Sequence, residues 1–173
     1  CGSEPLRLFG DALGDSVASM TSSLVLPAGA RMQFQHSYGF ESSVLLAMLG
    51  GAAFDAGRPF YPADIAEALA RLPRPRGLVT TPFHLKALLG AGLVLPEVDL
   101  VLSATAPLSP QLAQRAEQQL NGRLVEIYGC TEAGQVAARR TTAGEVWTTL
   151  GALRLHAGAA DGEPCIVEGG HVS

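Results

Sequence analysis

The chain has 173 residues, of which 47% are hydrophobic and 16% charged, a balance typical of one compact globular domain, or part of one, with a buried core. This composition excludes a disordered or fibrous protein. The net charge of −4 argues against a nucleic-acid-binding or membrane surface, and the longest apolar run, residues 44–54, is about half of what a membrane span needs.

Apolar periodicity and turn residues divide the chain into alternating strands and helices. The predicted strands cover residues 31–35, 52–54, 77–81, 98–102 and 123–127. The predicted helices cover residues 10–26, 41–49, 62–72, 82–90 and 110–120. Thr81 and Ser109, each followed by a proline, are typical N-cap residues for the last two helices, which end at Gly90 and before Asn121.

This alternation predicts an α/β fold with a layered parallel sheet and crossover connections. In such sheets, ligands bind outside the carboxyl ends of the strands. Four segments follow predicted strands: HSYG (36–39), TTP (80–82), SATAP (103–107) and YGCTE (128–132). They are rich in small and hydroxylated residues, so we expect them to share one edge of the sheet and to form a binding site.

A β-rich tail follows. Residues 136–150 turn at Ala143 and Gly144, and residues 153–170 turn around Asp161 and Gly162, which predicts two hairpins. We therefore expect an α/β subdomain over residues 1–136 and the start of a second, β-rich subdomain over residues 137–173.

The segment YGCTE suggests a nucleotide. Tyr128 could stack on a base and Thr131 could donate a hydrogen bond to a phosphate. Glu132 would repel a phosphate unless a cation lay between them, which suggests Mg²⁺. On the residues alone, an equally simple interpretation stays open, in which Tyr128 closes the sheet edge and Glu132 is a solvated loop charge.

Three segments together resemble the adenylate-forming superfamily, which contains acyl- and aryl-CoA synthetases, adenylation domains of nonribosomal peptide synthetases and luciferases. YGCTEAG looks like the Y-G-x-T-E motif of that superfamily, and LSATAPLSPQL is similar to its adenine-binding loop. QHSYGFESSVLLAMLGGAAF resembles the segment in which a histidine precedes an apolar helix. Three motifs in the right order are a stronger signal than any one of them.

The resemblance implies a role for each matching residue. The implied nucleotide site comprises Ser103, Ala104, Thr105, Ala106, Tyr128, Gly129 and Thr131. The implied catalytic residues are Thr131, Glu132 and His36, with Glu132 as the magnesium ligand. The implied carboxylic-acid site comprises His36, Tyr38, Gly39, Phe40 and Cys130.

Members of this superfamily convert a carboxylic acid to an acyl-AMP with ATP and then transfer the acyl group to a thiol. The resemblance therefore implies ATP or AMP and Mg²⁺ as cofactors, and CoA or a phosphopantetheine as acceptor. It also implies a small-molecule carboxylic acid as substrate and an acyl carrier protein as a possible partner. Nucleic acid and a membrane span are not expected.

The chain departs from the superfamily pattern at its start. CGSEPLRL, residues 1–8, stands where a Ser/Thr/Gly-rich phosphate loop ending in Pro-Lys is expected, and Leu6 occupies the lysine position. The only lysine, Lys86, falls in a predicted core helix and cannot replace the catalytic lysine. We expect a fragment of a large N-terminal domain, weakly active or inactive alone. Two functions stay open: an adenylating ligase, or a non-catalytic adenylate-binding or assembly module of the same fold.

The cysteines give no sign of a disulfide framework or a structural zinc site. Cys1, Cys130 and Cys165 are far apart and form no C-x-x-C pair, a pattern that indicates a reducing cytoplasm. Cys130 with His36 as base could be a nucleophile, although a small pocket-lining cysteine is the favoured interpretation.

Residues near the predicted acid site suggest the size of the substrate. Tyr38, Phe40, Thr80, Thr81 and Phe83 indicate a modest, partly aromatic pocket, which favours an aryl or short acyl acid over a long fatty acid. The arginines of RLPRPR (71–76) are interpreted as part of a solvated connecting segment.

Overall fold

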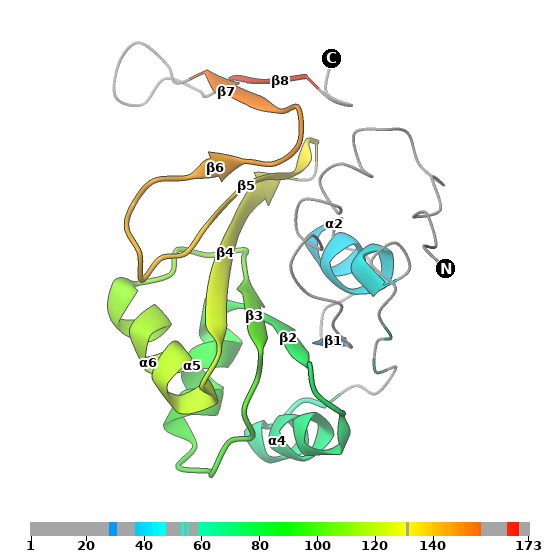
Figure 1. Cartoon of the computed structure of the whole chain (residues 1–173), viewed down its shortest axis with the longest axis vertical. Helices are drawn as coiled ribbons and strands as arrows, with labels where there is room; N and C mark the ends of the chain where they lie inside the picture. The colour runs from blue at the N-terminus through cyan, green and yellow to red at the C-terminus, as the bar shows by residue number, and fades with distance from the viewer. Residues whose placement is uncertain are drawn as a thin grey trace.

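The computed structural model describes residues 28–30, 37–47, 53, 55, 59–130, 132–156 and 166–169, which form a layered α/β unit with a β-rich end (Figure 1). The predicted helix at 10–26 and the predicted strand at 31–35 lie outside the described residues, as does most of the predicted strand at 52–54. The segment at residues 1–8 lies outside them as well.

A six-stranded sheet forms the centre of the unit, with its strands in sequence order. Its strands are β1 (Ala28–Ala30), β2 (Gly77–Thr80), β3 (Leu100–Ser103), β4 (Arg123–Cys130), β5 (Gly134–Arg139) and β6 (Thr148–Thr149). The first four strands pair in parallel, and β4·β5 and β5·β6 pair antiparallel. The carboxyl ends of the parallel strands therefore meet at one edge of the sheet. The parallel pairing of β2, β3 and β4 was predicted, whereas β1 was not among the predicted strands.

Local sequence signals position the helices that connect the parallel strands. These helices are α4 (Pro62–Arg71), α5 (Pro82–Gly90) and α6 (Pro110–Leu120). The backbone N–H of His84 donates to Thr81 Oγ1 at 3.3 Å, and that of Leu112 donates to Ser109 Oγ at 3.2 Å. Both predicted N-caps are thus confirmed. Asn121 takes a left-handed conformation that ends α6.

The helix predicted from Glu41 begins earlier and contains a π-helical turn. It starts as α2 (Ser37–Gly39) and continues as η1 (Phe40–Leu45). The hydroxyl of Ser43 donates to the carbonyl oxygen of Gly39, and a serine that bonds back in this way competes with the regular main-chain ladder. The apolar pattern began only at residue 41, so the start at Ser37 was missed.

Two apolar cores lie on opposite faces of the sheet because successive strand residues point to opposite sides. Leu78, Val101 and Leu124 pack with α4, α5 and α6. Val79 and Ile127 pack with Tyr38, Leu45 and Leu46 of the α2 and η1 segment on the other face. Figure 1 shows α2 apart from α5 and α6, with the sheet between them. The layered α/β prediction is confirmed.

The β-rich tail forms two hairpins, as predicted. β5 pairs with β6 in the main sheet, and β7 (Arg154–His156) pairs with β8 (Ile166–Glu168) in a separate two-stranded sheet. The main sheet continues past residue 136 through β5 and β6. The division of the chain at residue 136 stays a prediction.

The strand that carries the YGCTE segment is longer than predicted. β4 extends to Cys130, so Tyr128 and Gly129 lie in the strand and not in a loop after it. Antiparallel pairing with β5 extends it, because Gly129 pairs with Gln135 and Cys130 with Gly134. This pairing comes from β5, which lies later in the chain, so the local strand propensity of β4 did not indicate it.

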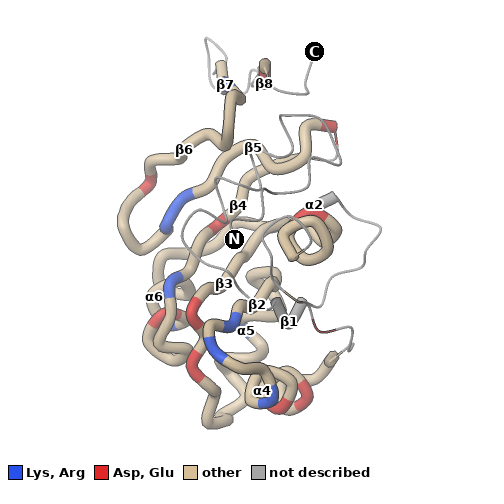
Figure 2. The backbone as a smooth tube through the Cα atoms, turned by 45° about the vertical axis from the view of Figure 1, so that its right-hand side comes forward, with Lys and Arg blue, Asp and Glu red and all other residues tan. Residues whose placement is uncertain are grey.

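The arginine cluster before β2 is paired with acidic groups. Arg74 contacts Asp99 and Glu97, and Arg76 donates to the carbonyl oxygens of Leu69 and Leu72 at the end of α4. Figure 2 shows basic and acidic positions interleaved around α4 and α5. The connecting-segment interpretation holds, and these arginines tie β2 and β3 to the end of α4. Within the described residues, no helix is long and apolar enough to cross a membrane.

Candidate functional site

A cavity of about 480 Å³ opens at the carboxyl ends of β3 and β4 and beside β5. Its lining comprises Tyr38, Ala104, Thr105, Ala106, Pro107, Glu126, Ile127, Tyr128, Gly129, Cys130, Gln135, Arg139 and Trp147. Three of the four segments expected at this edge therefore line one space. The fourth does not line the cavity but contacts a lining residue, because the hydroxyl of Tyr38 donates to the carbonyl oxygen of Thr80 at 3.3 Å. The volume is that of a small-molecule site.

The loop after β3 forms one wall and has a fixed shape. Thr105 is exposed and has φ of 78°, a left-handed conformation that non-glycine residues adopt at a cost of about 1–3 kcal/mol. Leu108 anchors the far end of the loop, because its backbone N–H donates to Glu126 Oε1 at 3.2 Å. The loop backbone is thus held against β4 with its small side chains beside the cavity.

Glu126 is a buried carboxylate that joins three parts of the site. It is 4% exposed, and its Oε2 accepts hydrogen bonds from Arg139 Nε at 2.7 Å and Thr141 Oγ1 at 2.8 Å. With Leu108 on Oε1, three donors satisfy the charge. A buried charge with this many partners is a rigid element, because each group that moves would leave another unpaired.

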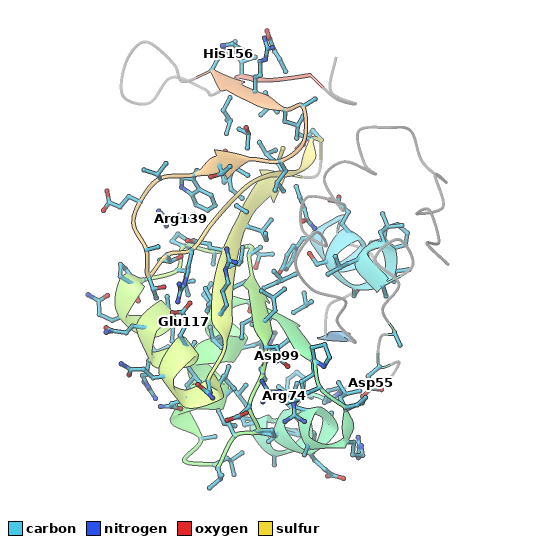
Figure 3. The ribbon with its side chains drawn as sticks, in the orientation of Figure 1. Asp55, Arg74, Asp99, Glu117, Arg139 and His156 are labelled. Atoms are coloured by element: carbon cyan, nitrogen blue, oxygen red, sulfur yellow. The ribbon has the colours of Figure 1, made fainter. Side chains whose placement is uncertain are left out.

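Aromatic and cationic side chains form another part of the lining. The ring centroids of Tyr128 and Trp147 are 5.8 Å apart, and the Arg139 guanidinium carbon lies 4.4 Å from the centroid of a Trp147 ring. Tyr128 is 47% exposed, so part of its ring is open to a ligand. Figure 3 shows Arg139 in the region between β4 and β6. A flat aromatic surface beside the small-residue loop suits a planar ring.

Polar groups line the side of the cavity next to α2 and η1. Gln135 donates through Nε2 to Ser42 Oγ at 2.7 Å and through its backbone N–H to Glu41 Oε2 at 3.1 Å. Burial raises the pKa of Tyr38 well above its usual value, and a hydrogen bond from Ser42 only partly opposes that rise. Tyr38 is therefore a protonated, neutral phenol at any physiological pH.

The structure brings together most, but not all, of the residues singled out from the sequence. Tyr38, Ala104, Thr105, Ala106, Tyr128, Gly129 and Cys130 line the cavity. Ser103 is fully buried, Gly39 is buried, and Phe40 is 38% exposed; none of them is among the lining residues. His36 and Thr131 lie outside the described residues.

Glu132 and Cys130 lie at the tight connection between β4 and β5. Glu132 is solvent-exposed in the turn and is not among the residues that line the cavity. Cys130 is an exposed free thiol. The described part of the chain contains no group of three or more His, Cys, Asp or Glu side chains able to hold a metal ion. The proposed magnesium role of Glu132 thus stays a prediction.

Four polar or aromatic lining residues were missed from the sequence, namely Glu126, Gln135, Arg139 and Trp147, as was the apolar Ile127. Glu126 lies between apolar residues in a predicted strand. A single charge at such a position could have indicated a functional residue. Gln135, Arg139 and Trp147 come from the hairpin after the YGCTE segment, which antiparallel pairing places beside β4. The predicted turn at Ala143 and Gly144 implies a hairpin, so it could have indicated that these residues lie near β4.

A layered α/β sheet with a cavity at its strand ends defines a small-molecule-binding α/β domain. Residues 25–158 match the family of AMP-binding enzymes, and the chain belongs to this family. The resemblance seen in the three sequence motifs is thereby confirmed. A search of curated protein sequences gave no significant match.

Solved structures of several enzymes share the fold at low sequence identity. ATP-bound MatB from Rhodopseudomonas palustris is similar with a TM-score of 0.71 and 17% identity, over 91% of this chain and 36% of that one. A single-residue variant of E. coli MenE with bound OSB-AMS gives a TM-score of 0.69 and 20% identity, over 86% of this chain and 33% of that one. The luciferase-like enzyme of the mealworm Zophobas morio gives 0.66 and 14%, over 90% and 40%. The chain thus spans well under half the length of these structures.

Proposed function

We propose that this chain is the nucleotide- and acid-binding part of an adenylate-forming ligase. The protein would activate a carboxylic acid, aryl or short acyl, with ATP and transfer it to a thiol. The observation that carries the proposal is the cavity itself, in which the loop after β3, Tyr128 and the polar groups beside Tyr38 face one space. Membership of the AMP-binding family supports the choice of nucleotide.

Two regions of the cavity suit the two halves of an acyl-AMP. The nucleobase would lie between the loop at Ala104–Ala106 and the ring of Tyr128, with Ser103 and Gly129 shaping the backbone around it. The acid would lie toward Tyr38, Gly39, Phe40 and Cys130, and the family resemblance assigns His36 to the same acid site. The family resemblance also assigns Thr131 the role of donating its hydroxyl to a phosphate oxygen.

In the first step, a carboxylate oxygen attacks the α-phosphorus of ATP, a new oxygen–phosphorus bond forms and pyrophosphate leaves. In the second, a thiol sulfur attacks the acyl carbonyl and AMP leaves. Several negative charges meet in the first step, so hydrogen-bond donors and cations must stabilise it. Thr131 and the catalytic groups carried by the rest of the protein would share this role.

Magnesium would supply charge neutralisation between the phosphates. Mg²⁺ usually takes one or two carboxylates and keeps several waters and substrate phosphates as its other ligands. Glu132, exposed in the turn between β4 and β5, is a donor of that type. Glu132 would hold the ion, which would supply positive charge beside the phosphates.

The acceptor would be CoA or a carrier-protein phosphopantetheine, and the protein would work in the cytoplasm. The choice of acceptor rests on the family, and the location rests on the widely spaced cysteines, of which Cys130 is a free thiol. MatB, one of the similar structures, was solved with bound ATP, which supports the nucleotide and leaves the acid open.

Isothermal titration of the chain with ATP and AMP, with and without Mg²⁺, tests the proposal. We expect AMP binding that is independent of magnesium and ATP binding that needs it. Glu132→Ala should weaken only the magnesium-dependent part, whereas Glu67→Ala, which removes an exposed carboxylate on α4, should change neither. A folded protein that binds neither nucleotide would contradict the proposal and favour a module in which the motif has only a structural role.

A further inference from the structure

Four polar groups form a chain of hydrogen bonds along the side of the cavity next to α2 and η1. Gln135 Nε2 donates to Ser42 Oγ at 2.7 Å, Ser42 bonds the phenol of Tyr38, and the Tyr38 hydroxyl donates to the carbonyl oxygen of Thr80 at 3.3 Å. All four residues are buried, so water does not compete for these groups.

The carbonyl oxygen of Thr80, at the end of this series, fixes the direction in which the hydrogen bonds are donated. A carbonyl oxygen can only accept, so the Tyr38 proton is committed to Thr80. The phenol oxygen then accepts a hydrogen bond from Ser42, and this bond uses the only hydroxyl proton of Ser42. Ser42 can therefore only accept from Gln135, and the amide must present its NH₂ group to Ser42. Its oxygen, Oε1, is turned to the other side.

Gln135 Oε1 is left without a donor. Gln135 is 3% exposed and lines the cavity, and within the described residues its Oε1 has no hydrogen-bond partner. Buried acceptors of this kind are rare, because an acceptor removed from water without a new donor destabilises the folded state. A donor on a bound ligand would remove that penalty.

We propose that the acid substrate carries a hydroxyl or amino group that donates to Gln135 Oε1, which makes Gln135 a specificity-determining residue. The inference rests on the proposed ligase function and names the class of acid. The amide belongs to the acid end of the cavity because its side-chain partner, Ser42, comes from η1, the helical segment that continues from α2 and Tyr38. Within the described residues, the aromatic pair of Tyr128 and Trp147 makes no hydrogen bond to Ser42 or the amide, and it forms the proposed nucleobase end.

ATP–pyrophosphate exchange by the full-length protein that carries this chain tests the inference with matched acids. The panel comprises benzoate and its 3- and 4-hydroxy, amino, fluoro and methoxy derivatives, with butanoate and 3-hydroxybutanoate as a short pair. Fluorine resembles a hydroxyl in size but donates no hydrogen bond. We expect kcat/KM for the best hydroxy or amino acid to exceed that for its fluoro analogue by about 10- to 100-fold.

Gln135→Met keeps the length and most of the volume of the side chain and removes the acceptor. We expect the ratio of kcat/KM between the hydroxy and fluoro acids to fall to about 1, while AMP affinity stays within about twofold of wild type. A ratio that survives in Gln135→Met would overturn the inference. A loss of AMP affinity as large as the loss of the hydroxy-to-fluoro ratio would also overturn the inference, because the donor would then be the adenine amino group.

Tyr38→Phe tests the direction of the hydrogen-bond chain. Without the phenol oxygen, the Ser42 proton is free to turn to Gln135 Oε1, and the amide can rotate to present its NH₂ group to the cavity. The preference should then move from hydroxy acids toward methoxy acids, which only accept. A side chain with a purely packing role would lower all rates together, and that result would contradict the inference.

The outcomes separate this inference from the ligase proposal. Exchange with fluoro and methoxy acids as efficient as with hydroxy and amino acids overturns the inference and leaves the ligase intact. A protein that exchanges pyrophosphate with none of the acids and binds no nucleotide overturns both. Thermal unfolding of each variant, followed by circular dichroism, confirms that the comparison is between folded proteins.

Discussion

Glu126 Oε2 and Arg139 Nε lie 2.7 Å apart, across the antiparallel pair of β4 and β5, and this ion pair closes one side of the cavity. The two residues face each other directly in the strand register. The same carboxylate holds Leu108 and Thr141. One buried charge thus fixes the loop after β3, the strand β5 and the hairpin beyond it.

Glu126→Ala should destabilise the protein by about 3–5 kcal/mol, because Arg139, Thr141 and the N–H of Leu108 all lose their acceptor. Urea unfolding followed by circular dichroism measures the loss. Glu67→Ala breaks the exposed pair with Arg71 and should cost no more than about 0.5 kcal/mol. Equal losses in the two variants would mean that the buried pair does not hold the site together.

Trp147 should contribute to nucleotide binding although it lies outside the three recognised motifs. Its ring contacts Tyr128 and carries the Arg139 guanidinium on its face, so Trp147→Ala leaves Tyr128 without lateral support. We expect AMP binding to weaken by about 1–3 kcal/mol, or 5- to 150-fold. Trp147→Phe keeps a ring and should retain most of the affinity. Isothermal titration checks both, and unchanged binding by the alanine variant would remove Trp147 from the site.

The sequence predicted well what depends on neighbours in the chain. The N-caps at Thr81 and Ser109 are confirmed because each is completed within three residues. The sheet edge was predicted because crossover connections leave parallel strands little choice of topology. Gln135 and Trp147 were missed because strand pairing across a hairpin, which no local pattern encodes, carries them to the cavity.

The stability of the protein should depend on pH through Asp99. A hydrogen bond from Arg74 holds the pKa of this carboxyl below its usual value, with further help from the backbone N–H of Arg76. Because the folded-state pKa is depressed, the stabilisation is present above the unfolded pKa of about 4 and is lost as the pH falls through the folded-state value.

Asp99→Asn isolates this contribution because the amide oxygen can still accept from Arg76. We expect the variant to unfold at a lower temperature than wild type at pH 7, and the difference to shrink steadily below pH ~4. Thermal unfolding monitored by circular dichroism between pH 3 and pH 7 measures it. A difference that stays constant over this range would exclude the Asp99 charge as its source. Figure 3 shows Arg74 and Asp99 well below Arg139, so AMP affinity at pH 7 should not change.

The pairing of β4 with β5 leaves no room for a side chain at Gly129, next to Tyr128. A Cβ at this position would lie 2.1 Å from the carbonyl oxygen of Gly134 on the paired strand, where only a backbone shift could relieve the clash. Gly129→Ala should destabilise the protein by about 1–3 kcal/mol and also weaken AMP binding, since the shift moves Tyr128.

Gly90→Ala is the matched control. Gly90 is the last residue of α5, has no atom within 4 Å of the added Cβ and does not need a left-handed backbone, so alanine there should be neutral or stabilising. Denaturant unfolding and titration with AMP compare the two variants. If Gly129→Ala bound AMP as tightly as Gly90→Ala, the close contact between β4 and β5 would not be what sets the position of Tyr128.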